Sequence, residues 1–382
     1  MDNFIIIGEN IVRFIVEKHN EETIADSMLS LRKKEDSYLD KIDKIINWNK
    51  IKRILDKKYK WTKNAAGNPA YPPLQMFKIL LLERWEKLSD PQMEFALRDR
   101  LSFIRFVGFS VMSDTPDYST ISRFRSRLLE LKLYDRLFDE INRQLKSKKL
   151  MVREKSAAVV DATVIESANR PRQVIKNIPE DRKEEDDTSN IDEEDKTGKT
   201  EEANKNSANN PSEKTTSHFE VEYSVDPDAR WLKKGRRNYF GYKGFIGANL
   251  KGFILNGLMT PANVSEISKF SDVLEVLNLS PDTPVLADKG YSSDKNREIL
   301  KNKQLKDFIM YKAVRGRKLT EYQKVVNKGI SKVRYVIEQV FGILKRHYHF
   351  DRCRYGGLEK VNMEFKLVSM AYNLKKAASM VI

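Results

Sequence analysis

The hydrophobic and polar positions of the first 150 residues alternate with the spacing of α-helices. Isoleucine and leucine recur at helical intervals, with charged residues between them. The helices predicted from this pattern are Lys41–Leu55, Leu74–Leu88, Asp90 to about Leu101, and Thr120–Leu133. Asp90, which stands before a proline, and Ser119 are the expected caps of the last two. We therefore expect residues 1–150 to form an all-helical N-terminal domain.

From Ala157 the pattern changes to short apolar runs mixed with helical stretches. The run Ala157–Val160 leads directly into Asp161, and the run Thr283–Ala287 leads directly into Asp288. Further strands are expected at His218–Val225, Tyr239–Leu250, Gly252–Met259 and Phe308–Tyr311, and helices at about Asp294–Lys303, Lys332–His347 and Asn362–Met380. Strands alternating with helices predict an α/β or α+β domain over residues 151–382.

An acidic, apolar-poor stretch interrupts this second domain at about residues 172–217. It holds 13 acidic and 8 basic residues, and between Pro179 and Ser217 its only large apolar residue is Ile191. Such a composition buries too little surface to offset the entropy lost on ordering. The stretch therefore predicts a disordered insertion, either a tolerated loop or an acidic segment that contacts proteins or a basic groove.

Composition and charge exclude several classes of protein and favour one class of partner. The chain has 382 residues, 40% of them hydrophobic, which excludes a mostly disordered protein. With 70 basic and 55 acidic residues the net charge is +15, and outside the acidic stretch it is +20, a surplus typical of nucleic-acid partners. No apolar run approaches the length of a membrane span, and a single cysteine, Cys353, excludes a disulfide framework. We therefore expect a cytoplasmic protein without membrane contact.

The candidate chemistry lies in Asp161, Asp288 and one charged helix face. Carboxylates after buried strands suit hard cations, although such residues also begin turns and cap helices. In the helix predicted over Lys332–His347, Glu338 shares a face with Arg334 and Lys345, and the apolar residues lie on the other side. The alternative is an ordinary amphipathic helix whose polar face is solvated and on which Arg334 and Glu338 form a routine ion pair, and without further context the pattern favours it.

A second set of basic residues lies on the predicted helix Thr120–Leu133. Arg123 and Arg127 share one face, and the helix follows a short helix and a chain-breaking turn. This arrangement is similar to a helix-turn-helix motif, whose second helix contacts DNA. The alternative is a solvated, charged helix face.

Several strings in this order resemble the DDE transposases of bacterial insertion sequences, in particular the group around insertion-sequence family five. The resemblance rests on Val159–Thr163, Ala287–Tyr291, the Arg334, Glu338 and Lys345 spacing, Tyr239–Lys243, Thr260–Asn263, Tyr71–Leu74 and Asp117–Arg125. It spans about residues 40–375. Ser331 stands where the family usually has a tyrosine, three residues before the arginine, which removes a ring that could stack on a base.

The resemblance implies an α/β fold of the ribonuclease-H-like type, a mixed β-sheet with helices on both faces, after the helical N-terminal domain. Asp161, Asp288 and Glu338 would be catalytic and would bind two Mg²⁺ ions, for which Mn²⁺ could substitute. Phosphates of DNA would contact Arg334, Lys345 and Lys289, in addition to Arg123 and Arg127 on the N-terminal helix.

The implied activity is cleavage of double-stranded DNA at the ends of an insertion sequence and transfer of those ends to target DNA. A homodimer is expected on DNA, because two ends must be brought together, and the protein is expected to associate with the bacterial nucleoid. Two alternatives stay open: a non-catalytic DNA-binding relic or repressor derived from a transposase, and a structure-directed nuclease that cleaves without joining.

Overall fold

The computed structural model describes residues 4–7, 10–13, 37–59, 70–151, 157–169, 171, 173–177, 219–223, 225–316 and 318–381. Contacts divide the chain into two units, one of residues 1–169 with 228–382 and the other of residues 170–227. The second unit contains an antiparallel pair, β4 (Gln173–Asn177) and β5 (Phe219–Tyr223). Most of the insertion predicted at 172–217 lies outside the described residues.

The N-terminal region is mainly helical, as predicted. Its helices are α2 (Tyr38–Ile45), α3 (Trp48–Lys58), α4 (Pro73–Glu86), α5 (Asp90–Asp99), α6 (Leu101–Val107), α7 (Tyr118–Glu130) and α8 (Tyr134–Ser147). A two-stranded hairpin, β1 (Phe4–Ile7) and β2 (Asn10–Arg13), precedes them and was not predicted. The single helix predicted over Lys41–Leu55 is wrong: the backbone is extended at Ile46 and Asn47, so the chain forms α2 and α3.

Both predicted helix caps are displaced by one or two residues. Ser89, not Asp90, caps α5, and Gln92 completes a capping box with it. Asp117, not Ser119, caps α7, and its carboxylate accepts a hydrogen bond of 2.6 Å from the amide of Thr120. At the start of α5 the side chain of Gln92 accepts a hydrogen bond from the amide of Ser89 (2.9 Å). The proline after Asp90 and the hydroxyl of Ser119 did not reveal these bonds from sequence alone.

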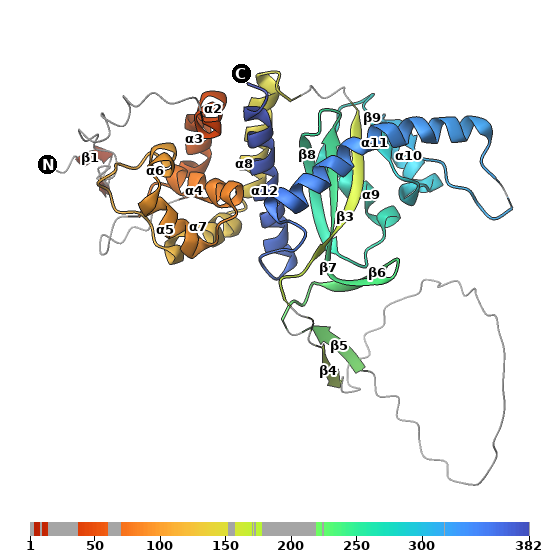
Figure 1. The fold of residues 1–382 in the computed structure, drawn as a ribbon, viewed down its shortest axis with the longest axis horizontal. Helices are drawn as coiled ribbons and strands as arrows, with labels where there is room; N and C mark the ends of the chain where they lie inside the picture. Colours follow the sequence, from red (N-terminus) through yellow and green to blue (C-terminus); the bar gives the residue numbers. More distant parts are fainter. Residues whose placement is uncertain are drawn as a thin grey trace, which may run out of the picture. The chain divides into compact units, whose positions relative to one another are not determined.

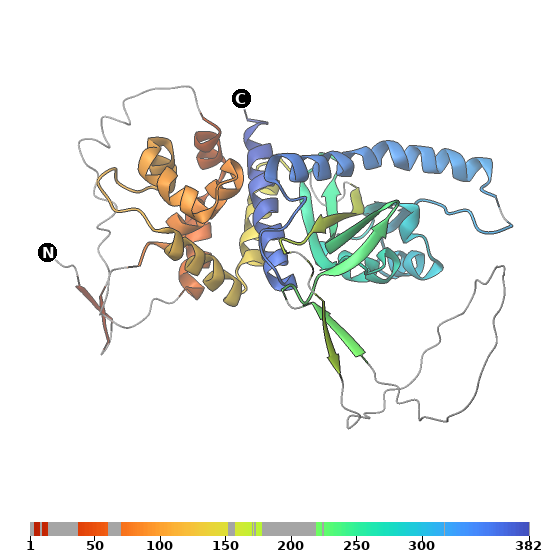
Figure 2. The same cartoon turned by 60° about the horizontal axis from the view of Figure 1, so that its bottom comes forward.

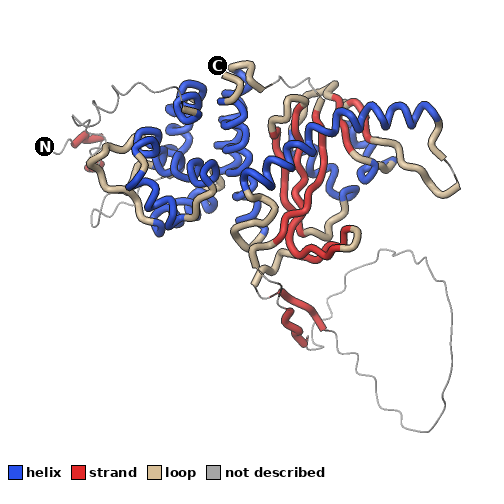
Figure 3. Tube along the Cα trace, in the orientation of Figure 1, coloured by secondary structure: helices blue, strands red, loops and turns tan. Residues whose placement is uncertain are grey.

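The second half of the unit is built on a mixed sheet, as predicted (Figures 1 and 3). Its strands are β3 (Ala158–Glu166), β6 (Arg230–Lys234), β7 (Arg237–Asn249), β8 (Ile254–Pro261), β9 (Pro284–Ala287) and β10 (Lys306–Ile309). The order is β10-β9-β3-β7, and β6 and β8 both pair with β7. Strands β3, β9 and β10 are parallel, and all pairs that involve β7 are antiparallel.

Helices cover both faces of this sheet (Figure 2). They are α9 (Glu266–Leu277), α10 (Asp294–Asn302), α11 (Glu321–Tyr348) and α12 (Leu358–Ala378). The side chain of Leu277 on α9 occupies the space beside Gly247, whereas Phe365 on α12 occupies the space beside Gly257 on the other face. Both glycines lie in the sheet, where a methyl group would collide with these packed side chains.

Helix α12 connects the sheet to the N-terminal helices. It is buried on nearly all sides, which is typical of a helix enclosed between two layers. Figure 1 shows it beside α8, and it also packs against α4, where the indole of Trp85 donates to the carbonyl of Ala371 (2.8 Å). At the same contact, Arg84 and Glu364 form a fully buried ion pair. No helix of the described residues is long and apolar enough to cross a membrane.

Candidate active site

Asp161 and Asp288 lie side by side at the edge of the sheet. Strands β3 and β9 run parallel, and their register pairs Val160 with Ala287. The residue after Val160 is Asp161, and the residue after Ala287 is Asp288. The prediction that Asp161 ends its strand is wrong, because β7 pairs with β3 as far as Glu166. Only the parallel ladder ends at this point. Asp288 follows β9 directly, as predicted, and begins a short 3-10 turn, Lys289–Tyr291.

The guanidinium of Arg334 bridges the two aspartates. Its Nη2 is 2.6 Å from Oδ2 of Asp161, and its Nη1 is 3.2 Å from Oδ1 of Asp288. The arginine side chain is only 11% exposed, so this face of α11 is directed at the sheet edge and is not solvated at this point. Burial raises the pKa of Asp161, against the opposing effects of Arg334 and of a hydrogen bond from the amide of Ala162 (2.8 Å).

The other predicted residues on α11 and in the turn are placed differently. Glu338 lies one helical turn after Arg334 and is exposed, with no hydrogen bond or ion pair to the described part of the chain. Lys345 is half-buried and its Nζ donates to the carbonyl of Val164 (3.1 Å), and burial lowers its pKa. Lys289 is exposed at the start of the turn after Asp288. The structure thus brings Asp161, Asp288 and Arg334 into contact and leaves Glu338 exposed, with no contact to the two aspartates.

Three residues that sequence reasoning missed surround the same edge: Lys243, Glu266 and Tyr291. Nζ of Lys243 donates to the carbonyl of Val264 (2.8 Å) and is 3.9 Å from Oε1 of Glu266. Burial raises the pKa of Glu266, and the charges of Asp161 and Asp288 add to this. Lys243 and Tyr291 belong to strings that carry the family resemblance, which was the only available signal for them.

The oxygen donors of Asp161 and Asp288 fit a hard divalent cation, and the guanidinium between them provides the positive charge that such an ion would bring. No group of three or more aspartate, glutamate, histidine or cysteine side chains in the described ranges is close enough to hold an ion as the side chains stand. Binding would therefore require Arg334 to withdraw and a further carboxylate to approach the pair.

The two arginines predicted on the N-terminal helix differ in their surroundings. Arg127 forms an ion pair with Glu130 (2.8 Å). Arg123 is exposed, and its Nη2 donates to the hydroxyls of Ser119 (3.3 Å) and Thr120 (3.1 Å), with no carboxylate partner among the described residues. Its positive charge near the start of α7 is therefore not held in an ion pair, although it acts on the nearby carboxylate of Asp117.

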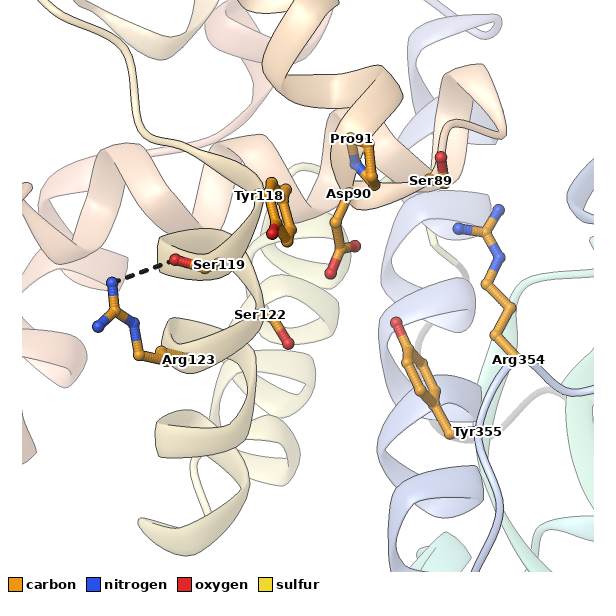
Figure 4. Close-up of a pocket in the computed structure, with 9 residues that line it drawn as sticks. All are labelled: Ser89, Asp90, Pro91, Tyr118, Ser119, Ser122, Arg123, Arg354 and Tyr355. Carbon is orange, nitrogen blue, oxygen red and sulfur yellow. Dashed lines mark hydrogen bonds between the residues drawn. The ribbon is translucent and has the colours of Figure 1, made fainter.

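Arg123 lines an open cavity of about 530 Å³. Figure 4 shows Arg123 and Tyr118 of α7 on one side of it, and Arg354 and Tyr355, which precede α12, on the other. The guanidinium of Arg354 donates to the carbonyl of Leu88 (2.7 Å) and forms no ion pair with the residues described here. The one acidic residue in the lining, Asp90, is engaged by Arg125. The cavity is consequently positive.

Comparisons with known proteins agree on one family. Residues 27–127 match the family model described as "Transposase domain (DUF772)", and residues 153–374 match "Transposase DDE domain". The chain is similar to the transposase for insertion sequence element IS1106 of Neisseria meningitidis serogroup B, with 37% identity over 319 residues, 83% of this chain and 95% of the relative.

The solved "Mos1 transposase paired-end complex with left transposon end" is 11% identical and aligns over 87% of this chain and 94% of that one, with a TM-score of 0.20. A score this low carries no argument about the fold.

Proposed function

Since the chain belongs to the DDE transposase family of insertion sequences, we propose that it cleaves DNA at the ends of its own insertion sequence and joins those ends to target DNA. In the first step water attacks the phosphorus at the element's end, the bond to the 3′ oxygen breaks, and that oxygen leaves as a 3′-hydroxyl. In the second step this hydroxyl attacks a target phosphodiester, whose own 3′ oxygen leaves. Each step exchanges one phosphorus–oxygen bond for another and needs no redox partner.

We assign the catalytic roles to Asp161, Asp288 and Glu338. Together they would hold divalent ions, two Mg²⁺ with Mn²⁺ as a substitute, which when bound activate the attacking oxygen and stabilise the leaving oxygen. Arg334 keeps the two aspartates close together before DNA arrives. Once it is released from them, Arg334 can contact a DNA phosphate, as can Lys289 and Lys345.

The strand order supports a ribonuclease-H-like sheet as the finer description of the fold. A long antiparallel strand, β7, lies beside β3, and the parallel strands β9 and β10 follow on the other side. We propose a domain boundary near residue 150, with residues 1–150 for DNA binding and dimerisation and residues 151–382 for catalysis. A homodimer on DNA follows from the need to hold two ends.

The observation that carries the proposal is the pair Asp161 and Asp288 on adjoining parallel strands, held by the same helix that presents Glu338. The test uses purified protein, Mg²⁺ and linear DNA that carries the gene's own flanks, with new 3′-hydroxyl ends and joined products as the readout. Cleavage with joining supports a transposase. Cleavage without joining supports a nuclease, and salt-sensitive binding without cleavage supports a DNA-binding relic.

Arg123 should contribute more to DNA binding than Arg127. Replacement of Arg123 by alanine removes a charge that is held in no ion pair with the described residues, so the slope of log affinity against log salt should fall by about 0.9 for each phosphate that the variant no longer neutralises. Arg127→Ala is the matched control on the same helix face, because its charge is already paired with Glu130. The measurement is fluorescence anisotropy with duplex DNA between about 50 and 200 mM salt. Equal reductions in the two variants would contradict the assignment.

A further inference from the structure

Glu266 is placed at the candidate active site by its helix. It is the first residue of α9, after the N-cap Ser265, where the partial positive charge of a helix start favours a carboxylate. Its side chain is 33% exposed and therefore half-buried. The carboxylate accepts no hydrogen bond from the residues that the structure describes, and its single ion pair, to Lys243, is long at 3.9 Å. Its oxygens therefore retain free lone pairs.

Gly290 provides the space for this carboxylate. A Cβ at position 290 would lie closer to Oε2 of Glu266 than Cβ atoms approach other heavy atoms in real proteins. Gly290 is the second residue of the turn that begins directly after Asp288. The carboxylate of Glu266 therefore lies against the turn that positions Asp288, and the glycine permits this approach.

Tyr291 provides an independent observation at the same place. Its hydroxyl is completely buried and has no hydrogen-bond partner among the described residues. It lies close enough to Asp161 and Glu266 for their charges to raise its pKa, after the larger effect of burial. A buried hydroxyl without a hydrogen-bond partner is unfavourable, so this group beside two carboxylates is available to bond the water of a bound ion.

We propose that Glu266 is a further cation-binding carboxylate of this site, which joins Asp161 and Asp288 when a divalent ion is bound. This inference rests on the proposed function, because it assumes that the site takes such an ion. Two side chains approach Asp288 from different helices. Arg334 on α11 contacts Asp288 itself, and Glu266 on α9 lies against the turn that comes directly after Asp288. When Arg334 withdraws and Glu266 approaches the two aspartates, three carboxylates supply the oxygen ligands that hard cations prefer.

The test measures Mn²⁺ binding to the full chain without DNA, by isothermal titration and by the loss of the free-ion electron paramagnetic resonance signal. We expect Glu266→Gln to weaken binding by about 10-fold or more. Gly290→Ala should have a similar effect although it changes no charge, since its methyl group displaces the carboxylate. Glu275→Gln, an exposed residue of the same helix, is the matched control and should bind as the wild type does.

Further variants separate this inference from the proposed function. Glu266→Asp should restore part of the affinity that Glu266→Gln removes, which a purely structural role for the side chain would not produce. If both Glu266→Gln and Gly290→Ala bind Mn²⁺ with the wild-type affinity, the inference is overturned. The proposed function would then still be tested separately, by the cleavage assay. If the wild type binds no Mn²⁺, or if Asp288→Asn binds it as well as the wild type does, the metal site itself is overturned, and Glu266 with it.

Discussion

The Asp288→Asn variant is expected to lose at least about 10³-fold in DNA end cleavage, because it removes a full negative charge from the proposed ion site while the side-chain shape is kept. Asp288 directly follows β9 and is 34% exposed, so the change creates no buried cavity. The contact of Arg334 with Asp161 remains, which preserves the packing of α11 on the sheet edge. DNA binding should therefore change little. The measurement is the rate of 3′-hydroxyl formation in Mg²⁺ with DNA that carries the element's ends.

Asp294→Asn is the matched control for this prediction. It makes the same chemical change at an exposed position in the first turn of α10, six residues along the chain. Cleavage by this variant should stay close to that of the wild type, and both variants should show the same urea unfolding midpoint as the wild type. An Asp288→Asn protein that folds and still cleaves at the wild-type rate would contradict the catalytic assignment.

The strand that leads to each aspartate could be predicted from sequence, because an apolar run before Asp161 and another before Asp288 are local signals. The pairing of β3 with β9, which brings the two aspartates together, joins segments far apart in the chain, and only the family resemblance implied it. The end of β3 could not be predicted, because β7 extends it by pairing far from it in sequence. Strand β6 could not be predicted either, because it is short and polar, with little apolar alternation of its own.

The partners of the charged residues could not be predicted, because they depend on tertiary packing. Helical spacing placed Arg334 and Glu338 on one face, but it could not show that Arg334 reaches across to both aspartates while Glu338 stays exposed. Glu266 was missed for a related reason. A single carboxylate at the start of a helix is ordinary in sequence, and its proximity to Asp288 depends on the turn at Gly290.

The Arg84→Met variant is expected to lose about 3–5 kcal/mol of free energy of unfolding, because it leaves the charge of Glu364 buried without its partner. Nη1 of Arg84 is 2.8 Å from Oε1 of Glu364, and the two side chains are only 1% and 2% exposed. Arg84 lies on α4 and Glu364 on α12, so the pair joins the N-terminal helices to the helix that covers the sheet. The measurement is equilibrium unfolding in urea, followed by circular dichroism.

The double variant Arg84→Met with Glu364→Leu separates the charge from the packing. Once both charges are gone no uncompensated ion remains, so the double variant should be clearly more stable than either single variant and close to the wild type. Arg98→Ala, which breaks the surface pair with Glu94, is the control and should cost at most about 1 kcal/mol. If the destabilising effects of the two buried single variants simply add, the pair is not coupled, and α12 is held to the N-terminal helices by its other contacts, such as the hydrogen bond from Trp85 to Ala371.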